Sequence, residues 1–277
     1  MDEPVFLELQ NFVNPRESIG KIASSDVVCC RQTHMVQSVL EAMLKSGLTR
    51  MPVTTKKGKL VGMVSALDIL DFLGGGSKYK IFVMNKKKTD QRIRNIMTRD
   101  FIALSGVSTV TRALADFKEH RRGALPIIHR GILRGIVREL DFALQINDAL
   151  GIDVGEIMVR TPIVARESYT INEVAKMMCR GGFKTLPVTE ENVYLGMVTP
   201  IDILSYLYKN KMLYRLRKAN RKVLRAMDKD AASVKPGADL YEAVLLMKQN
   251  KTSSLPVVED HDLMGIITAR DIVDALV

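Results

Sequence analysis

The stretch GMVSALD at residues 62–68 returns three times along the chain, as GIVRELD (135–141), GMVTPID (196–202) and GIITARD (265–271). Each copy begins with a glycine and two apolar residues and ends with an Asp, and the fourth residue is Ser or Thr in three of the four copies. A proline in an apolar context precedes every glycine by nine or ten residues. Successive Asp residues lie 73, 61 and 69 positions apart, so a repeat of this size accounts for the whole chain.

Periodicity changes in a fixed order within each repeat, most clearly in repeat 3. An extended segment at 161–165 precedes a helix that opens near Ser168 or Thr170 and is ended by Gly181 and Gly182. Two short apolar strands separated by a polar turn follow, and a second helix starts at Thr199. The order β-α-β-β-α predicts an α+β fold. Because one such unit cannot bury both faces of its sheet, we expect neighbouring repeats to pair.

The connectors between repeats predict two modules, residues 1–150 and 151–277. Glycine-rich and basic sequence joins repeats 1 and 2, a second basic run joins repeats 3 and 4, and a short segment joins repeats 2 and 3. The first module comprises repeat 1 (about 15–74), a basic linker (75–92) and repeat 2 (about 93–148). The second comprises repeat 3 (about 153–206), a basic linker (207–220) and repeat 4 (about 221–277).

Composition is typical of a cytoplasmic protein. Polar or charged residues interrupt every apolar run before the about 18 residues that a membrane span needs, and the first residues do not resemble a secretory signal. Cys29, Cys30 and Cys179 form neither a disulfide framework nor a CxxC spacing. The four histidines are scattered, so we expect no metal site and no catalytic triad.

The formal net charge of +10 favours anionic partners, including small molecules that carry phosphate. Residues 78–94 and 205–222 each carry seven basic side chains. Runs of this kind are more often solvated faces than nucleic-acid sites, so nucleic-acid binding is kept as an alternative. Few aromatic side chains in these runs could stack on bases: Tyr79, Phe82, Tyr206, Tyr208 and Tyr214.

The four motifs, in phase with a preceding proline and helix, resemble those of the CBS-domain (cystathionine β-synthase motif) family. Four such motifs form two Bateman modules, and the run DFLGGGSKYK (71–80) is similar to archaeal proteins that resemble the γ subunit of AMP-activated protein kinase. The resemblance implies a non-catalytic regulatory protein that binds AMP, ADP or ATP in clefts between paired motifs. It would signal energy state to a protein partner or to its own assembly, as a closed disk or a homodimer.

The resemblance also implies roles for particular residues. In the family, the motif Asp holds the ribose hydroxyls, which here indicates Asp68, Asp141, Asp202 and Asp271. The Ser or Thr three residues earlier contacts phosphate, which indicates Ser65, Thr199 and Thr268. The base pocket lies where the first strand of each motif enters, near Val28, Ile102, Ile163 and Ala232.

Basic residues predict where phosphate contacts are strongest. Arg50 in repeat 1 and Lys184 in repeat 3 stand just before the motif proline, where similar γ-subunit proteins place phosphate-binding residues, whereas repeats 2 and 4 have small residues there. Arg138 and Arg270 are further candidates. We therefore expect fewer than four equivalent sites.

A purely structural role for the Ser/Thr and Asp pair is a serious alternative, because [ST]-x-x-[DE] is also a capping box. A carboxylate at a helix start can also accept two hydrogen bonds from a cis-diol, and helix N-termini favour phosphate. Repeat 2 distinguishes the two roles, because Arg138 cannot accept a capping hydrogen bond while Asp141 is kept. That difference favours a ligand role for the Asp, and predicts that repeat 2 is the most altered site.

Other function classes receive less support. A different adenosyl ligand, such as S-adenosylmethionine, is an alternative to the adenine nucleotides. An enzyme of the inosine monophosphate dehydrogenase type carries a CBS pair, but the repeats leave no room for its barrel of about 250 residues. The stretch Gly74 to Lys78 lacks the spacing of a P-loop and is expected to be a flexible connector.

Overall fold

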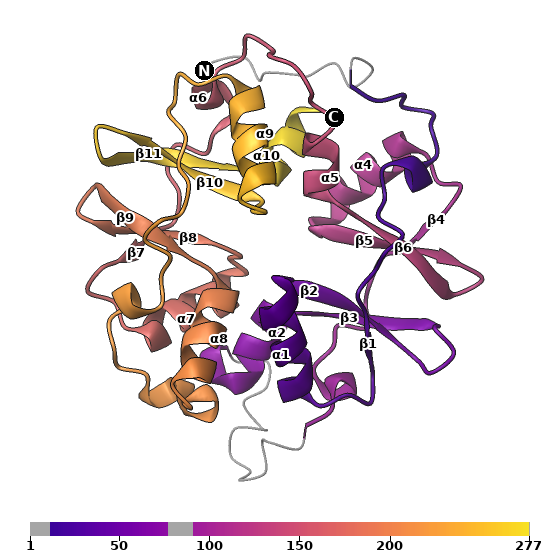
Figure 1. The fold of residues 1–277 in the computed structure, drawn as a ribbon, viewed down its shortest axis with the longest axis horizontal. Helices are drawn as coiled ribbons and strands as arrows, with labels where there is room; N and C mark the ends of the chain where they lie inside the picture. Colours follow the sequence, from indigo (N-terminus) through magenta and orange to yellow (C-terminus); the bar gives the residue numbers. More distant parts are fainter. Residues whose placement is uncertain (1–11, 77–90, 277) are drawn as a thin grey trace. The chain divides into compact units, whose positions relative to one another are not determined.

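The computed structural model describes residues 12–76 and 91–276, and the positions named above at 78–90, including Tyr79 and Phe82, lie outside them. In repeat 1 the predicted order of elements is confirmed (Figure 1). A parallel pair of strands and an antiparallel hairpin form the sheet β1-β2-β3. The elements are β1 (Cys30–Arg31), α1 (Val36–Ser46), β2 (Arg50–Thr54), β3 (Leu60–Ser65), α2 (Ala66–Leu70) and the π-helical turn η3 (Asp71–Gly75).

The same order recurs in the other three repeats, which confirms the α+β fold. Repeat 2 has β4 (Leu104–Ser105), α4 (Val110–His120), β5 (Ala124–His129), β6 (Ile132–Arg138) and α5 (Glu139–Ala143). Repeat 3 has β7 (Ala165–Arg166), α7 (Ile171–Gly181), β8 (Leu186–Glu190), β9 (Val193–Val198) and α8 (Pro200–Lys209). Repeat 4 has α9 (Leu240–Gln249), β10 (Ser254–Glu259), β11 (Asp262–Thr268) and α10 (Ala269–Ala275), and its first strand is a single parallel bridge between Val234 and Val257.

Local sequence explains the helix boundaries. Helix α7 starts at the Thr170 cap, where the Thr170 side chain accepts from the Glu173 amide at 3.2 Å. Helices α1 and α7 end at Gly47 and Gly182, both left-handed with φ of 68° and 70°, a conformation that glycine adopts without strain.

The described chain divides into two compact units. Residues 12–27, 102–162 and 232–276 form a unit that contains repeats 2 and 4, and residues 28–76, 91–101 and 163–231 form a unit that contains repeats 1 and 3. Each unit has its own apolar core. In the repeat 1/3 unit, α2 and η3 pack against α7 and α8. In the repeat 2/4 unit, α5 packs against α10, and Phe117 and Phe142 meet edge to face at 5.7 Å.

Each repeat is preceded by a short lead segment that pairs with a different repeat. The segments contain η2 (Ile19–Lys21), η5 (Ile93–Asn95), α6 (Val154–Ile157) and η7 (Val223–Arg225). The segment that leads into repeat 1 pairs with repeat 2 through Ser24 and Ile136, and the segment that leads into repeat 2 pairs with repeat 1 through Thr98 and Met63. Repeats 3 and 4 exchange their segments in the same way, through Asp228 with Met197 and Val159 with Ile266.

Each lead segment is held against its partner repeat by paired backbone hydrogen bonds. Ser24 and Ile136 donate to each other's carbonyl at 3.0 Å, and Asp228 and Met197 do so at 2.7 and 2.9 Å. The start of each lead segment forms a second bridge to the repeat with which the segment pairs, at the residue just before the first helix of that repeat. The bridged pairs are Ser18–Thr109, Met35–Arg92, Asp153–Asp239 and Thr170–Lys222. This exchange between consecutive repeats agrees with the modules 1–150 and 151–277, which stay a prediction.

The lead segment lies against the motif glycine of the repeat with which it pairs. A Cβ added at Gly62, Gly196 or Gly265 would lie less than 3.0 Å from the segment's carbonyl oxygen, a distance that real Cβ atoms essentially never show, and at Gly135 the contact would be very tight. The separations are 2.9 Å (Gly62 to Thr98), 3.0 Å (Gly135 to Ser24), 2.4 Å (Gly196 to Asp228) and 2.7 Å (Gly265 to Val159). The recurrence of this glycine is therefore explained by close backbone approach.

The expectation of a flexible connector at the glycine run is wrong for its first two residues. Gly74 and Gly75 are buried at the end of η3. A Cβ on Gly75 would lie 2.8 Å from Cys179 Sγ and 3.2 Å from the Ala175 carbonyl on α7. These glycines allow two helical segments to approach closely, and residues 77 and 78 lie outside the described part of the chain.

We expect Gly265→Ala to lower the free energy of unfolding by about 1–3 kcal/mol, because the new methyl group would overlap the Val159 carbonyl and the Met158 side chain. Gly237→Ala is the matched control in the same repeat, since nothing lies within 4 Å of its added Cβ. Denaturant titration of both variants measures the difference. Equal stability of the two would contradict the role given to the motif glycine.

Candidate functional site

Three of the four motifs form capping boxes at the start of their second helix. In repeat 1 the Ser65 amide and hydroxyl donate to Asp68 Oδ2 at 2.8 and 2.6 Å, and the Asp68 amide donates back to Ser65 Oγ at 3.2 Å. Thr199 and Asp202 repeat this arrangement at 2.8, 2.6 and 3.3 Å. Thr268 and Asp271 do so at 2.7, 2.7 and 3.4 Å.

The capping role leaves one carboxylate oxygen for other partners. In all three boxes the bonds described go to Oδ2, and none goes to Oδ1 of Asp68, Asp202 or Asp271. The three Asp residues are half-buried. Capping and ligand binding are therefore compatible at the same Asp, because each role uses a different oxygen.

Burial acts on two of these carboxylates. Burial raises the pKa of Asp202 above its ordinary value, and the hydrogen bonds from Thr199 offset that effect only in part. Burial likewise raises the pKa of Asp271, against the bonds from Thr268. Both carboxylates would gain from an additional hydrogen-bond donor, since donors favour the ionised form.

Repeat 2 differs from the other three because the Arg138 side chain forms an ion pair with the motif carboxylate, Asp141. The Arg138 guanidinium donates through Nη2 to Asp141 Oδ1 at 2.7 Å and through Nε to Oδ2 at 3.2 Å, and the Arg138 amide donates to Oδ2 at 2.8 Å. Both oxygens of the buried Asp141 thus have partners within the chain. This ion pair gives Asp141 a structural role that sequence reasoning did not anticipate.

Arg270 is also engaged within the repeat 2/4 unit. Its guanidinium forms an ion pair with Glu139 and donates to the Phe117 carbonyl at 3.4 Å. Glu139 is buried at the first position of α5, and Phe117 lies in the last turn of α4. Arg270 therefore links α10 to two helices of repeat 2. Sequence reasoning missed Glu139, which follows the motif position taken by Arg138.

The two basic residues before the motif prolines do not occupy equivalent positions. Arg50 begins β2 and is the cross-strand partner of Ser65. In repeat 3 the register pairs Leu186 with Val198, so the position equivalent to Arg50 is Thr185, and Lys184 lies one residue earlier. Lys184 therefore precedes the start of β8 (Leu186–Glu190) by two residues, whereas Arg50 is the first residue of its strand.

The four expected base-lining residues share one position in the fold. Val28, Ile102 and Ile163 each lie two residues before the first strand of their repeat, and Ala232 lies two residues before the Val234 bridge. Each is also the first residue of a chain segment that enters a new compact unit. Val28 and Ile163 are 48% and 52% exposed, which is high for large apolar side chains.

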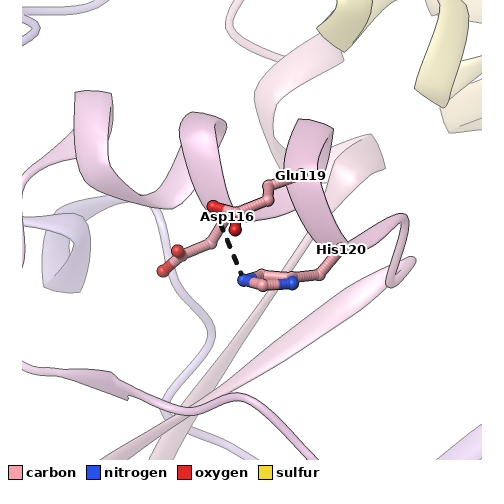
Figure 2. A group of neighbouring side chains, drawn as sticks. All are labelled: Asp116, Glu119 and His120. Atoms are coloured by element: carbon pink, nitrogen blue, oxygen red, sulfur yellow. Dashed lines mark ion pairs between the residues drawn. The ribbon is translucent and has the colours of Figure 1, made fainter.

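One group of side chains in the described structure has metal-ligand chemistry. Figure 2 shows Asp116, Glu119 and His120 on helix α4. Their ligand atoms all lie within 4.8 Å of one another. His120 Nε2 lies 3.7 Å from Glu119 Oε2, while Arg112 Nη2 pairs with Asp116 Oδ1 at 2.8 Å. The sequence did not predict this cluster, and an ion pair with Arg112 explains the buried Asp116 without a metal.

Among the described helices, none combines the length and apolar character needed to cross a membrane.

Comparison with known proteins assigns the family. The CBS domain model matches residues 19–75, 93–148, 154–209 and 221–277, so the chain belongs to the CBS-domain family. The matched ranges include the lead segments as well as the motifs. The predicted resemblance is thereby confirmed.

Two relatives match this chain over most of their own length. Protein MJ1225 of Methanocaldococcus jannaschii is 27% identical over 271 residues, which cover 92% of this chain and 97% of that protein. Its solved structure, suggested to be an archaeal homologue of γ-AMPK, has a TM-score of 0.84 and covers 93% of this chain and 99% of its own. A 33.4 kDa protein from the ribosomal RNA operon of Thermofilum pendens is 28% identical over 255 residues, or 87% and 85% of the two chains.

A partial match concerns an enzyme. Inosine-5′-monophosphate dehydrogenase of Korarchaeum cryptofilum is 31% identical over 183 residues, which cover 65% of this chain and 35% of the enzyme. The similarity is confined to the CBS region of that enzyme.

We expect the raised pKa of Asp202 to make stability depend on pH. The folded state binds this proton more tightly than the unfolded state, so the contribution is present below the unfolded pKa and is lost as pH rises through the folded pKa. Asp202→Asn removes this loss. The melting temperature of Asp202→Asn minus that of the wild type should increase as pH is raised from about 4 to 7. The same difference for the control Asp230→Asn, at an exposed position, should not increase with pH. A constant difference across that range would contradict the role of burial.

Proposed function

We propose that this CBS-domain protein binds adenosine nucleotides (AMP, ADP or ATP) without catalysis and reports their level to a partner protein or to its own assembly. The observation that carries the proposal is the oxygen Oδ1 of Asp68, Asp202 and Asp271, which the capping boxes leave as an acceptor. Each such carboxylate stands at a helix start beside a strand end. The similarity to MJ1225, suggested to be an archaeal homologue of γ-AMPK, supports a regulatory function of this kind.

The chemistry of these positions suits a ribose. A cis-diol offers two hydroxyl donors, and charge-assisted hydrogen bonds to a carboxylate are worth roughly 1.5–3 kcal/mol each. Helix α8 starts at Pro200, which has no amide hydrogen, and the Thr199 and Asp202 amides are used in the capping box. The Ile201 amide and the partial positive charge of the helix start favour an anion beside the ribose. Ribose and phosphate would thus find partners within one turn of helix.

The sites differ in what they can offer. The repeat 1/3 unit has two motifs with an available carboxylate oxygen, at Asp68 and Asp202. In the repeat 2/4 unit, Asp271 keeps its oxygen, but Asp141 is paired with Arg138 and Arg270 is paired with Glu139. We therefore assign the stronger sites to repeats 1 and 3, with Val28 and Ile163 against the base. The cytoplasmic location and the existence of a protein partner remain predictions.

Titration calorimetry of the full chain with AMP, ADP, ATP and S-adenosylmethionine tests the proposal. We expect at least one adenine nucleotide to bind, and the double variant Arg50→Ala, Lys184→Ala to weaken its binding about ten-fold or more by removing charge-assisted contacts to phosphate. Lys56→Ala, Lys57→Ala is the matched control, because it removes two positive charges from an exposed turn. Absence of binding by all four ligands, or equal affinity of both double variants, would overturn the proposal or the phosphate assignment respectively.

We expect Arg138→Ser to open repeat 2. The substitution restores the hydroxyl of the other three motifs and releases Asp141 Oδ1 from the guanidinium. The number of AMP molecules bound per chain should increase, as measured by calorimetry at saturating nucleotide. Arg134→Ser, at an exposed position on the same strand β6, provides the control. Unchanged stoichiometry in Arg138→Ser would show that the ion pair does not close this site.

A further inference from the structure

The connector between repeats 3 and 4 carries a dense, one-signed charge. From residue 203 to residue 227 the chain has no Asp or Glu and eight Lys or Arg residues. Six of these lie at residues 213–225, the stretch that contains η6 (Leu213–Lys218) and η7, and all six are exposed. We call this set the basic ribbon: Arg215, Arg217, Lys218, Arg221, Lys222 and Arg225.

The basic ribbon is fixed to the repeat 1/3 unit by apolar anchors between the charges. Leu213, Leu216, Ala219 and Val223 are at most 7% exposed and belong to the core of that unit. The Ile171 amide donates to the Arg221 carbonyl at 2.9 Å, and the Val223 amide donates to the Tyr169 carbonyl at 2.8 Å. The backbone is thus held at the start of α7, and the alternation of buried and exposed positions directs the basic side chains to solvent.

These charges have little compensation within the described part of the chain. Within the described residues, the ribbon forms one ion pair, in which Lys222 Nζ lies 3.4 Å from Glu167 Oε1. The Arg217 side chain lies over Gly74, with Nε 3.3 Å from the position of an added Cβ. An uncompensated cluster of this kind creates a positive potential that attracts polyanions.

The composition of the ribbon favours a phosphate backbone over a protein surface. Protein interfaces have an apolar core, whereas the apolar side chains between the charges of the ribbon are buried in the core of the unit. Binding of single strands relies on several exposed aromatic rings. Tyr206 and Tyr214 pack on the core, and Tyr208, which is 38% exposed and donates its hydroxyl to Glu41 at 2.9 Å, offers a single ring. We propose that the basic ribbon binds the phosphate backbone of double-stranded nucleic acid without reading its sequence.

Fluorescence anisotropy of the full chain with a labelled mixed-sequence DNA duplex tests this proposal. Between about 50 and 200 mM salt the logarithm of the association constant should fall linearly with the logarithm of salt concentration, with a slope of about −0.9 per phosphate contact. Arg215→Gln, Lys218→Gln, Arg221→Gln should reduce that slope by about three and weaken binding at least ten-fold. Arg134→Gln, Lys235→Gln, Lys248→Gln is the control, because it removes three exposed charges from the repeat 2/4 unit.

The outcomes are distinct. Loss of binding in the ribbon variant alone supports the proposal, provided that both variants melt as the wild type does. Absence of duplex binding at about 50 mM salt, or an equal loss in both variants, overturns it. Tighter binding of polyglutamate or of phosphatidylserine vesicles than of the duplex also overturns it and assigns the ribbon to another polyanion. The test does not depend on nucleotide binding, since the ribbon contains none of the candidate nucleotide-site residues.

Discussion

The structure depends on one backbone contact that recurs in every repeat, in which a lead segment lies against the motif glycine. Two hydrogen bonds join the segment to the residue after the glycine, and the segment's carbonyl lies where any Cβ would stand. Since each segment comes from the neighbouring repeat in sequence, the contact ties consecutive repeats together while their helices pack in the units 1/3 and 2/4. The repeats therefore cannot be regarded as independent domains.

The motif that contains this glycine also fixes the position of the Asp carboxylate. The glycine fixes the strand against the lead segment, and three residues later the strand ends at the Ser or Thr that caps the next helix. The Asp follows within the first helical turn, so its carboxylate has a defined place at the strand end. In repeats 1, 3 and 4 the cap uses one carboxylate oxygen, and in repeat 2 the Arg138 guanidinium uses both. In repeats 1, 3 and 4 the structural role and the proposed binding role of the Asp thus use different oxygen atoms of one carboxylate.

Sequence patterns predicted the order of elements because apolar periodicity and caps such as Thr170 are local signals. They did not predict the exchange of lead segments, which depends on contacts between distant residues such as Ser24 and Ile136. The dipeptide Ile-Met at 96–97 and 157–158, before the first strands of repeats 2 and 3, was an available signal for two of those segments. At the site, the positions of Asp68 and Asp202 follow from the motif, whereas the partners of Arg138 and Arg270 depend on side-chain geometry. The offset between Arg50 and Lys184 required the strand register.

The central claim is that a motif carboxylate accepts hydrogen bonds from both ribose hydroxyls of a bound adenine nucleotide. Competition between AMP and its 2′,3′-dideoxy analogue measures this most directly, because the analogue keeps the base and the phosphate and lacks only the two donors. Two charge-assisted bonds of roughly 1.5–3 kcal/mol each correspond to a loss of about 100-fold or more in affinity. A loss of this size is the expected result, and equal affinity of the two compounds would contradict the account.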